Sequence, residues 1–458
     1  MAQPTAGILV VGLNRALLAH APRMAAFASG CTTRELRPVL PAVTCSVQAS
    51  MLTGLLPREH GIVGNGWYDR TLAEVQFWKQ SSRLVGGERV WETARRGGPA
   101  ITCAKLFLWY NMYSSADWSV TPRPMYKADG RKLPDVYSQP PELRERLQAE
   151  LGPFPLFDFW GPRASIRSSR WIADATLSVH RAVHPTLTLI YLPHLDYALQ
   201  RLGPGHAGIP SAVREIDGEA GRLLDHFTGA GVRVLLLSEY GIEAVDAPVH
   251  INRALRREGA LRVRSEQGLE LLDAGASAAF AVADHQVAHV YVREAGDVSR
   301  IAAICRDVPG VERVLDREAQ AAEGIDHARG GELVLVARRG AWFAYYYWLD
   351  DARAPDFART VDIHRKPGYD PVELVLNPRI PAAPLYVAGK LLARRLGMRT
   401  LLDVIPLDAS LIRGSHGRVD QPADERPLLI GEGVPAGSEP LPCTAVRDVI
   451  LSTLAVGD

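Results

Sequence analysis

Short runs of apolar residues alternate with amphipathic stretches along most of the chain. Four runs are mostly apolar and short enough to predict buried strands: residues 7–13, 100–107, 185–193 and 233–237. Strands with two covered faces give such runs in parallel sheets. The stretches between them have helical periodicity, as at residues 20–29, 169–183 and 212–227. This alternation predicts an α/β fold with a mostly parallel central sheet flanked by helices.

The pattern changes in two places. Residues 109–162 are rich in proline and aromatic residues, which predicts an irregular cap insertion that either faces a substrate or packs on its own aromatics. Residues 279–350 predict a small inserted α+β subdomain, with a hairpin of GGELVLVA and WFAYYYW around Arg338 to Gly340. We therefore divide the chain into a core of residues 1–278, an inserted subdomain of residues 279–350, and a second core part of residues 351–458.

Polar residues follow three of the predicted strands. Asn14, Asp196 and Glu239 stand directly after or close to their ends. Ligands and catalytic groups gather at the carboxyl ends of strands in open sheets. Thr44 stands ahead of the helix-like SVQASMLTGLL, where a hydroxyl group would lie at the positive end of the helix dipole. Thr44 is therefore either a helix cap or a nucleophile.

Composition narrows the function. Lys plus Arg total 52 and Asp plus Glu total 51, so no nucleic-acid surface is indicated. The five cysteines form no C-x-x-C pair, which argues against a zinc ribbon or a disulfide framework. The N-terminal apolar run is short and lacks a basic segment before it, and no apolar run reaches the length of a membrane span. We therefore expect a cytoplasmic protein without a membrane span.

Further polar residues are candidates for the same chemistry. Asn65 ends a glycine-rich loop, and His416 stands on a turn between glycines. A second group lies in polar segments of the C-terminal half and consists of Asp362, His364, Asp370, His285 and His289. Each of these residues has an alternative role as an ordinary hydrogen-bonding loop residue.

The ungapped segment of residues 41–69, PAVTCSVQASMLTGLLPREHGIVGNGWYD, resembles the nucleophile region of the type I phosphodiesterase/nucleotide pyrophosphatase family. That family belongs to the alkaline phosphatase superfamily, and its pattern is P-T-x-T, T-G, P-x-x-H-G-I-x-x-N and Y-D. The resemblance implies an alkaline-phosphatase-like fold. It places Thr44 at the nucleophile and Asn65 at the asparagine that holds a phosphate oxygen.

The resemblance also implies a set of metal ligands, some of which differ in type here. Asp196 and His416 match the family. Asn14 stands at a family aspartate, Gln200 at a histidine, and Glu239 with Tyr240 at an Asp-His pair. One half-site would contain Asp196, Gln200 and His416, and the other Asn14, Thr44, Glu239 and Tyr240. Amide oxygens suit hard cations better than Zn²⁺.

We therefore expect a metal-dependent hydrolase of phosphodiester, pyrophosphate or related phosphoryl bonds, with a threonine nucleophile and one or more Zn²⁺, Mn²⁺ or Mg²⁺ ions. Its substrate would be a small phosphorylated or nucleotide-like molecule. His285, His289, Asp362, His364 and Asp370 are the candidates for replacement ligands. The main alternative is a catalytically degenerate family member that binds a ligand or a partner protein. A third possibility is sulfuryl or phosphonate chemistry at the same nucleophile turn.

Overall fold

The computed structural model describes residues 2–98 and 101–454. Its main sheet has nine strands in the order β23-β2-β22-β11-β1-β10-β5-β6-β9. The central strands β11, β1, β10, β5 and β6 are mutually parallel, whereas β22 and β9 pair with their neighbours antiparallel. The strands are β1 (Thr5–Val10), β2 (Thr32–Arg37), β5 (Cys103–Leu106), β6 (Trp118–Pro122), β9 (Val136–Gln139), β10 (Leu187–Leu192), β11 (Arg233–Leu237), β22 (Leu428–Gly431) and β23 (Leu441–Pro442).

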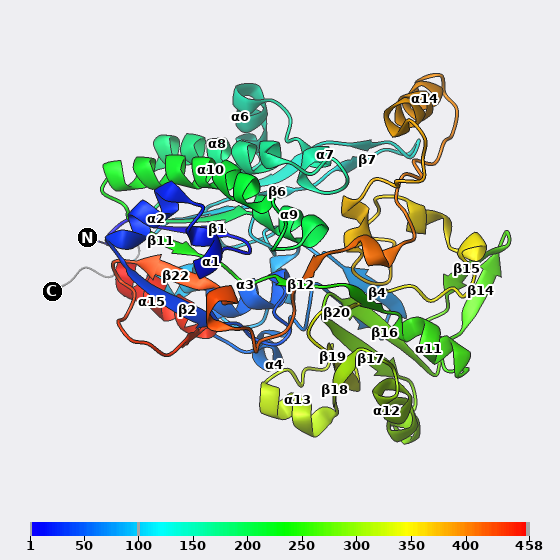
Figure 1. Cartoon of the computed structure of the whole chain (residues 1–458). Helices are drawn as coiled ribbons and strands as arrows, with labels where there is room; N and C mark the ends of the chain where they lie inside the picture. Colours follow the sequence, from blue (N-terminus) through cyan, green and yellow to red (C-terminus); the bar gives the residue numbers. More distant parts are fainter. Residues whose placement is uncertain (1, 99–100, 455–458) are drawn as a thin grey trace.

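Helices cover both faces of this sheet, as Figure 1 shows. The helices are α1 (Arg15–Leu18), α2 (Pro22–Ser29), α3 (Thr44–Thr53), α4 (Pro57–His60), α5 (Val90–Gly97), α6 (Glu142–Leu151), α7 (Leu156–Phe159), α8 (Ile166–Val183), α9 (His194–Leu202), α10 (Ile209–Gly229), α11 (Ile251–Arg257), α12 (Val298–Arg306), α13 (Arg317–Glu323), α14 (Ala383–Arg395) and α15 (Val446–Leu454). The fold is therefore the α/β architecture that the sequence predicts.

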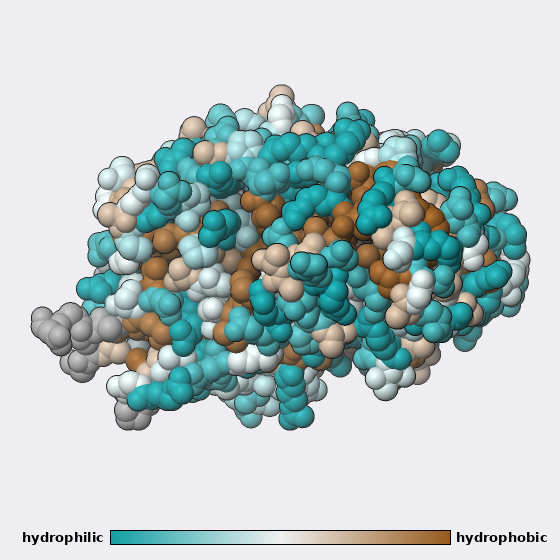
Figure 2. All heavy atoms as spheres, turned by 90° about the horizontal axis from the view of Figure 1, so that it is seen from below, coloured by the Kyte–Doolittle hydropathy of each residue, from teal (hydrophilic) through white to brown (hydrophobic). Residues whose placement is uncertain are grey.

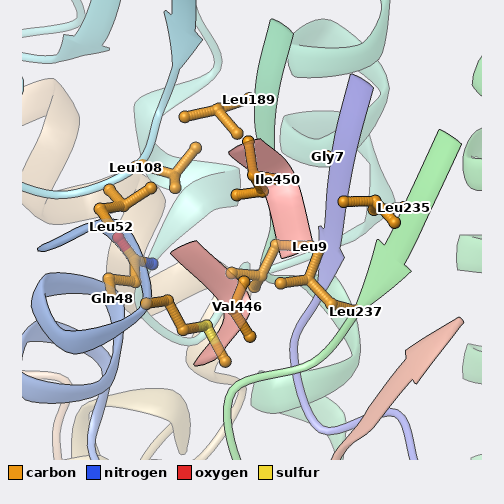
Figure 3. Close-up of a pocket in the computed structure, with 11 residues that line it drawn as sticks. Gly7, Leu9, Gln48, Leu52, Leu108, Leu189, Leu235, Leu237, Val446 and Ile450 are labelled. Atoms are coloured by element: carbon orange, nitrogen blue, oxygen red, sulfur yellow. The ribbon is translucent and has the colours of Figure 1, made fainter. Parts of the chain in front are cut away.

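Alternate residues of the central strands point to opposite helix layers. Leu9, Leu189 and Leu237 line a small apolar pocket together with residues of α3 and α15 (Figure 3). All ten residues of α3 are buried, and the helix ends at Gly54, whose φ of 73° lies in the left-handed region that glycine adopts without strain. The sheet and α15 thus fix the axis of α3, and with it the position of Thr44.

A second sheet occupies the other end of the molecule. It has the order β16-β17-β19-β18, made of Ala279–Asp284, Val287–Val292, Leu333–Ala337 and Val311–Leu315. Its apolar core is separate from that of the main sheet. The residues of this core come from distant parts of the sequence, the first being Phe77 and the last Ile412. These strands lie where the sequence predicts an α+β subdomain, and the division of the chain into domains stays a prediction.

Two expectations about local structure need correction. The predicted hairpin of GGELVLVA and WFAYYYW does not form, because β20 (Ala341–Phe343) pairs in parallel with β13 (Ala247–Val249) rather than with β19. Residues 109–162 are not only an irregular cap, since β6 and β9 extend the main sheet. In both cases a strand partner distant in sequence determines the structure.

Five further strand pairs are short. They are β3 (Gly66–Asp69) with β4 (Glu74–Phe77), β7 (Met125–Tyr126) with β8 (Lys132–Leu133), β12 (Glu243–Ala244) with β21 (Gly414–Ser415), β13 with β20, and β14 (Val263–Glu266) with β15 (Leu269–Leu272). The face of the molecule in Figure 2 is mostly hydrophilic, with hydrophobic residues visible in narrow strips. Among the described residues, no helix is both long and apolar enough to cross a membrane.

Candidate active site at the N-terminus of α3

Thr44 is the first residue of α3, and its side chain belongs to a buried chain of hydrogen bonds. Its Oγ1 lies 3.0 Å from the Tyr240 hydroxyl oxygen, and that hydroxyl donates to Asp196 Oδ1 at 3.4 Å. Because Tyr240 donates to the carboxylate, Thr44 is the donor to Tyr240. Burial raises the pKa of Asp196 to about 7, while hydrogen bonds from Gln200 and Tyr240 oppose the increase. The three residues form a route for a proton from Thr44 to a carboxylate.

The parallel strands bring these residues together. Asp196 lies in the first turn of α9, which follows β10, and Tyr240 lies just after β11. Since β10 and β11 flank β1 on either side, their carboxyl ends open onto the same edge of the sheet. Thr44 reaches this edge at the start of α3, and His416 reaches it directly after β21.

His416 is a neutral acceptor at this edge. Its Nδ1 donates to the carbonyl oxygen of Ala42 at 2.8 Å, so the ring hydrogen is on Nδ1. Burial lowers the pKa of His416 to about 3. The ring stacks on Tyr240, with 3.7 Å between the ring centroids. It also contacts the ring of His285, which is tilted by 36° at a centroid distance of 3.6 Å. Its Nε2 is 3.9 Å from Asp196 Oδ1 and has no hydrogen-bond partner among the described residues.

Two further residues of the predicted site are held by neighbours that sequence reasoning missed. Gln200 donates to Asp196 Oδ2 at 2.8 Å and accepts a hydrogen bond from the Tyr369 hydroxyl at 2.8 Å. Glu239 accepts a hydrogen bond from Gln48 Nε2 at 2.7 Å. Gln48 stands four residues after Thr44, so both lie on the same face of α3. That spacing is the sequence signal that could have identified Gln48 as a neighbour of the site. No local signal indicated Tyr369.

Asn65 also lies against the start of α3. Its Oδ1 accepts a hydrogen bond from the backbone N–H of Cys45 at 3.0 Å. Its own backbone N–H and Nδ2 donate to Asp284 at 2.7 and 3.0 Å. Burial raises the pKa of Asp284 to about 7 although both donors of Asn65 oppose this. Asp284 therefore orients Asn65 next to the first turn of α3.

Of the remaining candidates, His285 lies at the site. Its ring contacts His416 and stacks on Tyr369, with 3.8 Å between the ring centroids of His285 and Tyr369. Asn14 caps α1 by accepting a hydrogen bond from the backbone N–H of Leu17 at 2.9 Å. The others have partners of their own: Asp370 pairs with Lys366, His289 donates to the Val63 carbonyl, His364 contacts the Phe77 carbonyl, and Asp362 lies 4.0 Å from Arg365.

The side chains at this edge do not fit as ligands of the two-ion centre that the family resemblance implies. Both oxygens of Asp196 accept hydrogen bonds, and Asn14 Oδ1 is occupied by its helix cap. Glu239 accepts a hydrogen bond from Gln48 through Oε1, which leaves Glu239 Oε2 and His416 Nε2 as buried acceptors without partners among the described residues. Across residues 2–98 and 101–454, no cluster of three or more His, Cys, Asp or Glu side chains could hold a metal ion. Gln200 and Tyr240 bring N–H and O–H donors to the carboxylate that a cation would otherwise neutralise.

Comparisons with known proteins are consistent across sequence and structure. A family model described as type I phosphodiesterase/nucleotide pyrophosphatase matches residues 5–370. Ectonucleotide pyrophosphatase/phosphodiesterase family member 1 of Homo sapiens is 24% identical over 222 residues, which are 47% of this chain and 20% of the human protein. The match thus spans only about a fifth of that relative's length.

Solved structures share the fold over the whole chain. Phosphonoacetate hydrolase from Sinorhizobium meliloti 1021 has a TM-score of 0.63 at 16% identity, covering 99% of this chain and 96% of its own. Murine ectonucleotide pyrophosphatase/phosphodiesterase 5 has a TM-score of 0.58 at 14% identity with the same coverage. An inactive variant of the murine protein was solved in complex with AMP. These solved structures therefore show that the fold is shared.

Proposed function

Because this chain belongs to the type I phosphodiesterase/nucleotide pyrophosphatase family of the alkaline phosphatase superfamily, we propose that it hydrolyses a phosphoryl ester with Thr44 as the nucleophile. The observation that carries the proposal is the hydrogen-bond chain from Thr44 through Tyr240 to Asp196. A hydroxyl nucleophile needs a neighbouring base, and these hydrogen bonds connect Thr44 to the Asp196 carboxylate.

In the first step, Thr44 Oγ1 forms a bond to phosphorus and the bond from phosphorus to the leaving oxygen breaks. The threonine proton passes to Tyr240, and the tyrosine proton passes to Asp196. A carboxylate with a pKa of about 7 suits a base that works near neutral pH. The positive end of the α3 dipole stabilises negative charge on the phosphoryl oxygens.

In the second step, water releases the phosphoryl group from Thr44. His416 Nε2 is a buried acceptor without a partner among the described residues, so it is available to orient that water by accepting a hydrogen bond from it. The water oxygen bonds to phosphorus, one water proton moves to a phosphoryl oxygen of the product, and the bond between phosphorus and Thr44 Oγ1 breaks. Asp196 returns its proton through Tyr240 to the threonine oxygen.

The substrate class follows from the family and its neighbours. We propose a phosphodiester or pyrophosphate of a small, nucleotide-like molecule, since a structural neighbour was solved with AMP. The structural similarity to phosphonoacetate hydrolase favours a phosphonate as the alternative substrate. Asn65, held beside α3 by Asp284, is the residue that would contact a phosphoryl oxygen.

Thr44→Ala is expected to reduce turnover of bis(p-nitrophenyl) phosphate by about 1,000-fold or more, because the nucleophile is removed. Release of p-nitrophenol measures this. Thr53→Ala is a matched control, since Thr53 is also a buried threonine of α3 but lies at the other end of the helix, where it bonds the carbonyl of Ala49 and the backbone N–H of Leu55. Unchanged turnover in the Thr44 variant would exclude Thr44 as nucleophile. Loss of wild-type turnover after treatment with EDTA would contradict the proton route through Tyr240.

One observation favours a second candidate function. Thr44, Asn65, Tyr240, Asp196 and His416 are each at most 5% exposed, so the site is closed over its own hydrogen bonds. A degenerate family member that binds a ligand or a partner protein would have such a site. Absence of turnover on phosphodiester, pyrophosphate and phosphonate substrates, together with a rise in melting temperature with AMP, would support this candidate over the hydrolase.

A further inference from the structure

Helix α14 (Ala383–Arg395) projects from the body of the molecule and can be followed at the upper right of Figure 1. None of its thirteen residues is buried. Tyr386 and Val387 are its contacts with the apolar core of the second sheet. The Tyr386 hydroxyl also donates to Asp403 at 2.7 Å. One side of α14 is therefore attached to the protein, and the rest is open to solvent.

The open side of α14 carries large apolar residues. Leu385, Leu392 and Leu396 are 74%, 59% and 69% exposed. Their spacing of i, i+7 and i+11 places them on a single face of the helix. Leu391 on the helix and Met398 just beyond it are also more than half exposed. Single exposed leucines are ordinary on a soluble protein, but a row of them on one projecting helix indicates a binding surface.

The same segment has a charge unlike that of the whole chain. Residues 374–402 contain Arg379, Lys390, Arg394, Arg395 and Arg399 but no Asp or Glu, whereas the chain as a whole is nearly neutral. Lys390 pairs with Asp403 at 3.2 Å, and Arg394 donates to the Thr400 carbonyl. Arg379, Arg395 and Arg399 form no ion pair with any residue that the structure describes.

We propose that α14 docks this protein on an anionic lipid bilayer. A helix with exposed leucines on one face and unpaired arginines around it is suited to lie in the interface, with the leucines among the acyl chains and the arginines at the acidic headgroups. Thirteen residues span about 20 Å, which is shorter than the roughly 30 Å hydrocarbon core, so α14 lies on the membrane and does not cross it.

The leucines distinguish a bilayer from other anionic partners. A nucleic-acid backbone would neutralise Arg395 and Arg399 but would leave Leu385, Leu392 and Leu396 in water. An anionic bilayer satisfies the charges and the apolar row at the same time. This proposal does not depend on the activity of Thr44, because α14 contributes no residue to the site at α3.

Sedimentation of the full-length protein with lipid vesicles tests the proposal. We expect the wild type to bind vesicles of phosphatidylcholine with about 30% phosphatidylserine and not vesicles of phosphatidylcholine alone, with affinity falling as salt is raised. Leu385→Ser/Leu392→Ser/Leu396→Ser is expected to abolish binding. Arg395→Glu/Arg399→Glu is expected to weaken it by at least about 30-fold, at roughly 1 kcal/mol for each basic residue.

Matched controls separate docking from general surface effects. Leu72→Ser changes a leucine that is 61% exposed outside this segment, and Arg146→Glu/Arg257→Glu makes the same change in net charge at exposed sites elsewhere. Both controls should bind as the wild type does, and all variants should keep its melting temperature. No binding to the acidic vesicles, or equal binding by the leucine variant, would overturn the proposal. Binding to duplex DNA that survives the leucine changes would assign the surface to nucleic acid instead.

Discussion

The variant Asn14→Asp/Gln200→His/Glu239→Asp/Tyr240→His is expected to bind Zn²⁺, whereas the wild type is not. The four changes restore the carboxylates and imidazoles that the family resemblance places around Thr44. They also remove the donors that now occupy Asp196, namely the Gln200 amide and the Tyr240 hydroxyl. Removing the tyrosine also frees Thr44 Oγ1 from its present partner. With His416 Nε2 already unpartnered, each ion would gain at least three ordinary ligands.

Zinc should then stabilise the folded variant by about 2.7 kcal/mol for each occupied site when its concentration is 100 times the dissociation constant of that site. Calorimetric titration and thermal melts with and without Zn²⁺ measure the effect. The matched control adds Asp196→Ala to the four changes and should lose most of the zinc response. A comparable rise in the wild type would contradict our conclusion that its donors do not fit a metal centre.

Lys366→Met is expected to destabilise the protein by about 3–5 kcal/mol. Lys366 is buried, and its Nζ lies 2.7 Å from both Asp370 and Glu373. Burial alone lowers the pKa of Lys366, but the charges of Asp370 and Glu373 outweigh it and raise the pKa. The lysine is therefore charged at neutral pH, and removing it leaves two buried carboxyl groups facing each other. Urea unfolding at neutral pH measures the change.

Two variants test this explanation. Lys366→Met/Asp370→Asn/Glu373→Gln removes all three charges and should recover much of the lost stability, because no uncompensated charge remains. Lys127→Met, at an exposed lysine, should change the free energy of unfolding by less than about 0.5 kcal/mol. A loss below about 1 kcal/mol in Lys366→Met would show that the charged cluster is not needed. The cluster matters to the site because it anchors the loop whose Tyr369 holds Gln200.

Much of the fold could be predicted from periodicity. The apolar run at residues 7–13 overlaps β1, and the runs at residues 100–107, 185–193 and 233–237 contain β5, β10 and β11. The helical stretches predicted at residues 20–29, 169–183 and 212–227 correspond to α2, α8 and α10. Prediction was weaker where strand partners are distant, as for β20, because period-2 alternation shows that a segment is extended but not which strand it pairs with.

The sequence by itself determined the turn that begins α3 and the spacing from Thr44 to Asn65, because both depend on consecutive residues and local hydrogen bonds. Only the tertiary structure decided which hydrogen bonds the polar residues form there. Asp284 holds Asn65 from 219 positions away, and Tyr240 reaches Thr44 across 196. It also decided that Asp370 and His289 serve other contacts. The reason is physical: burial and packing between distant strands set these distances, and residue type at one position does not encode its partner.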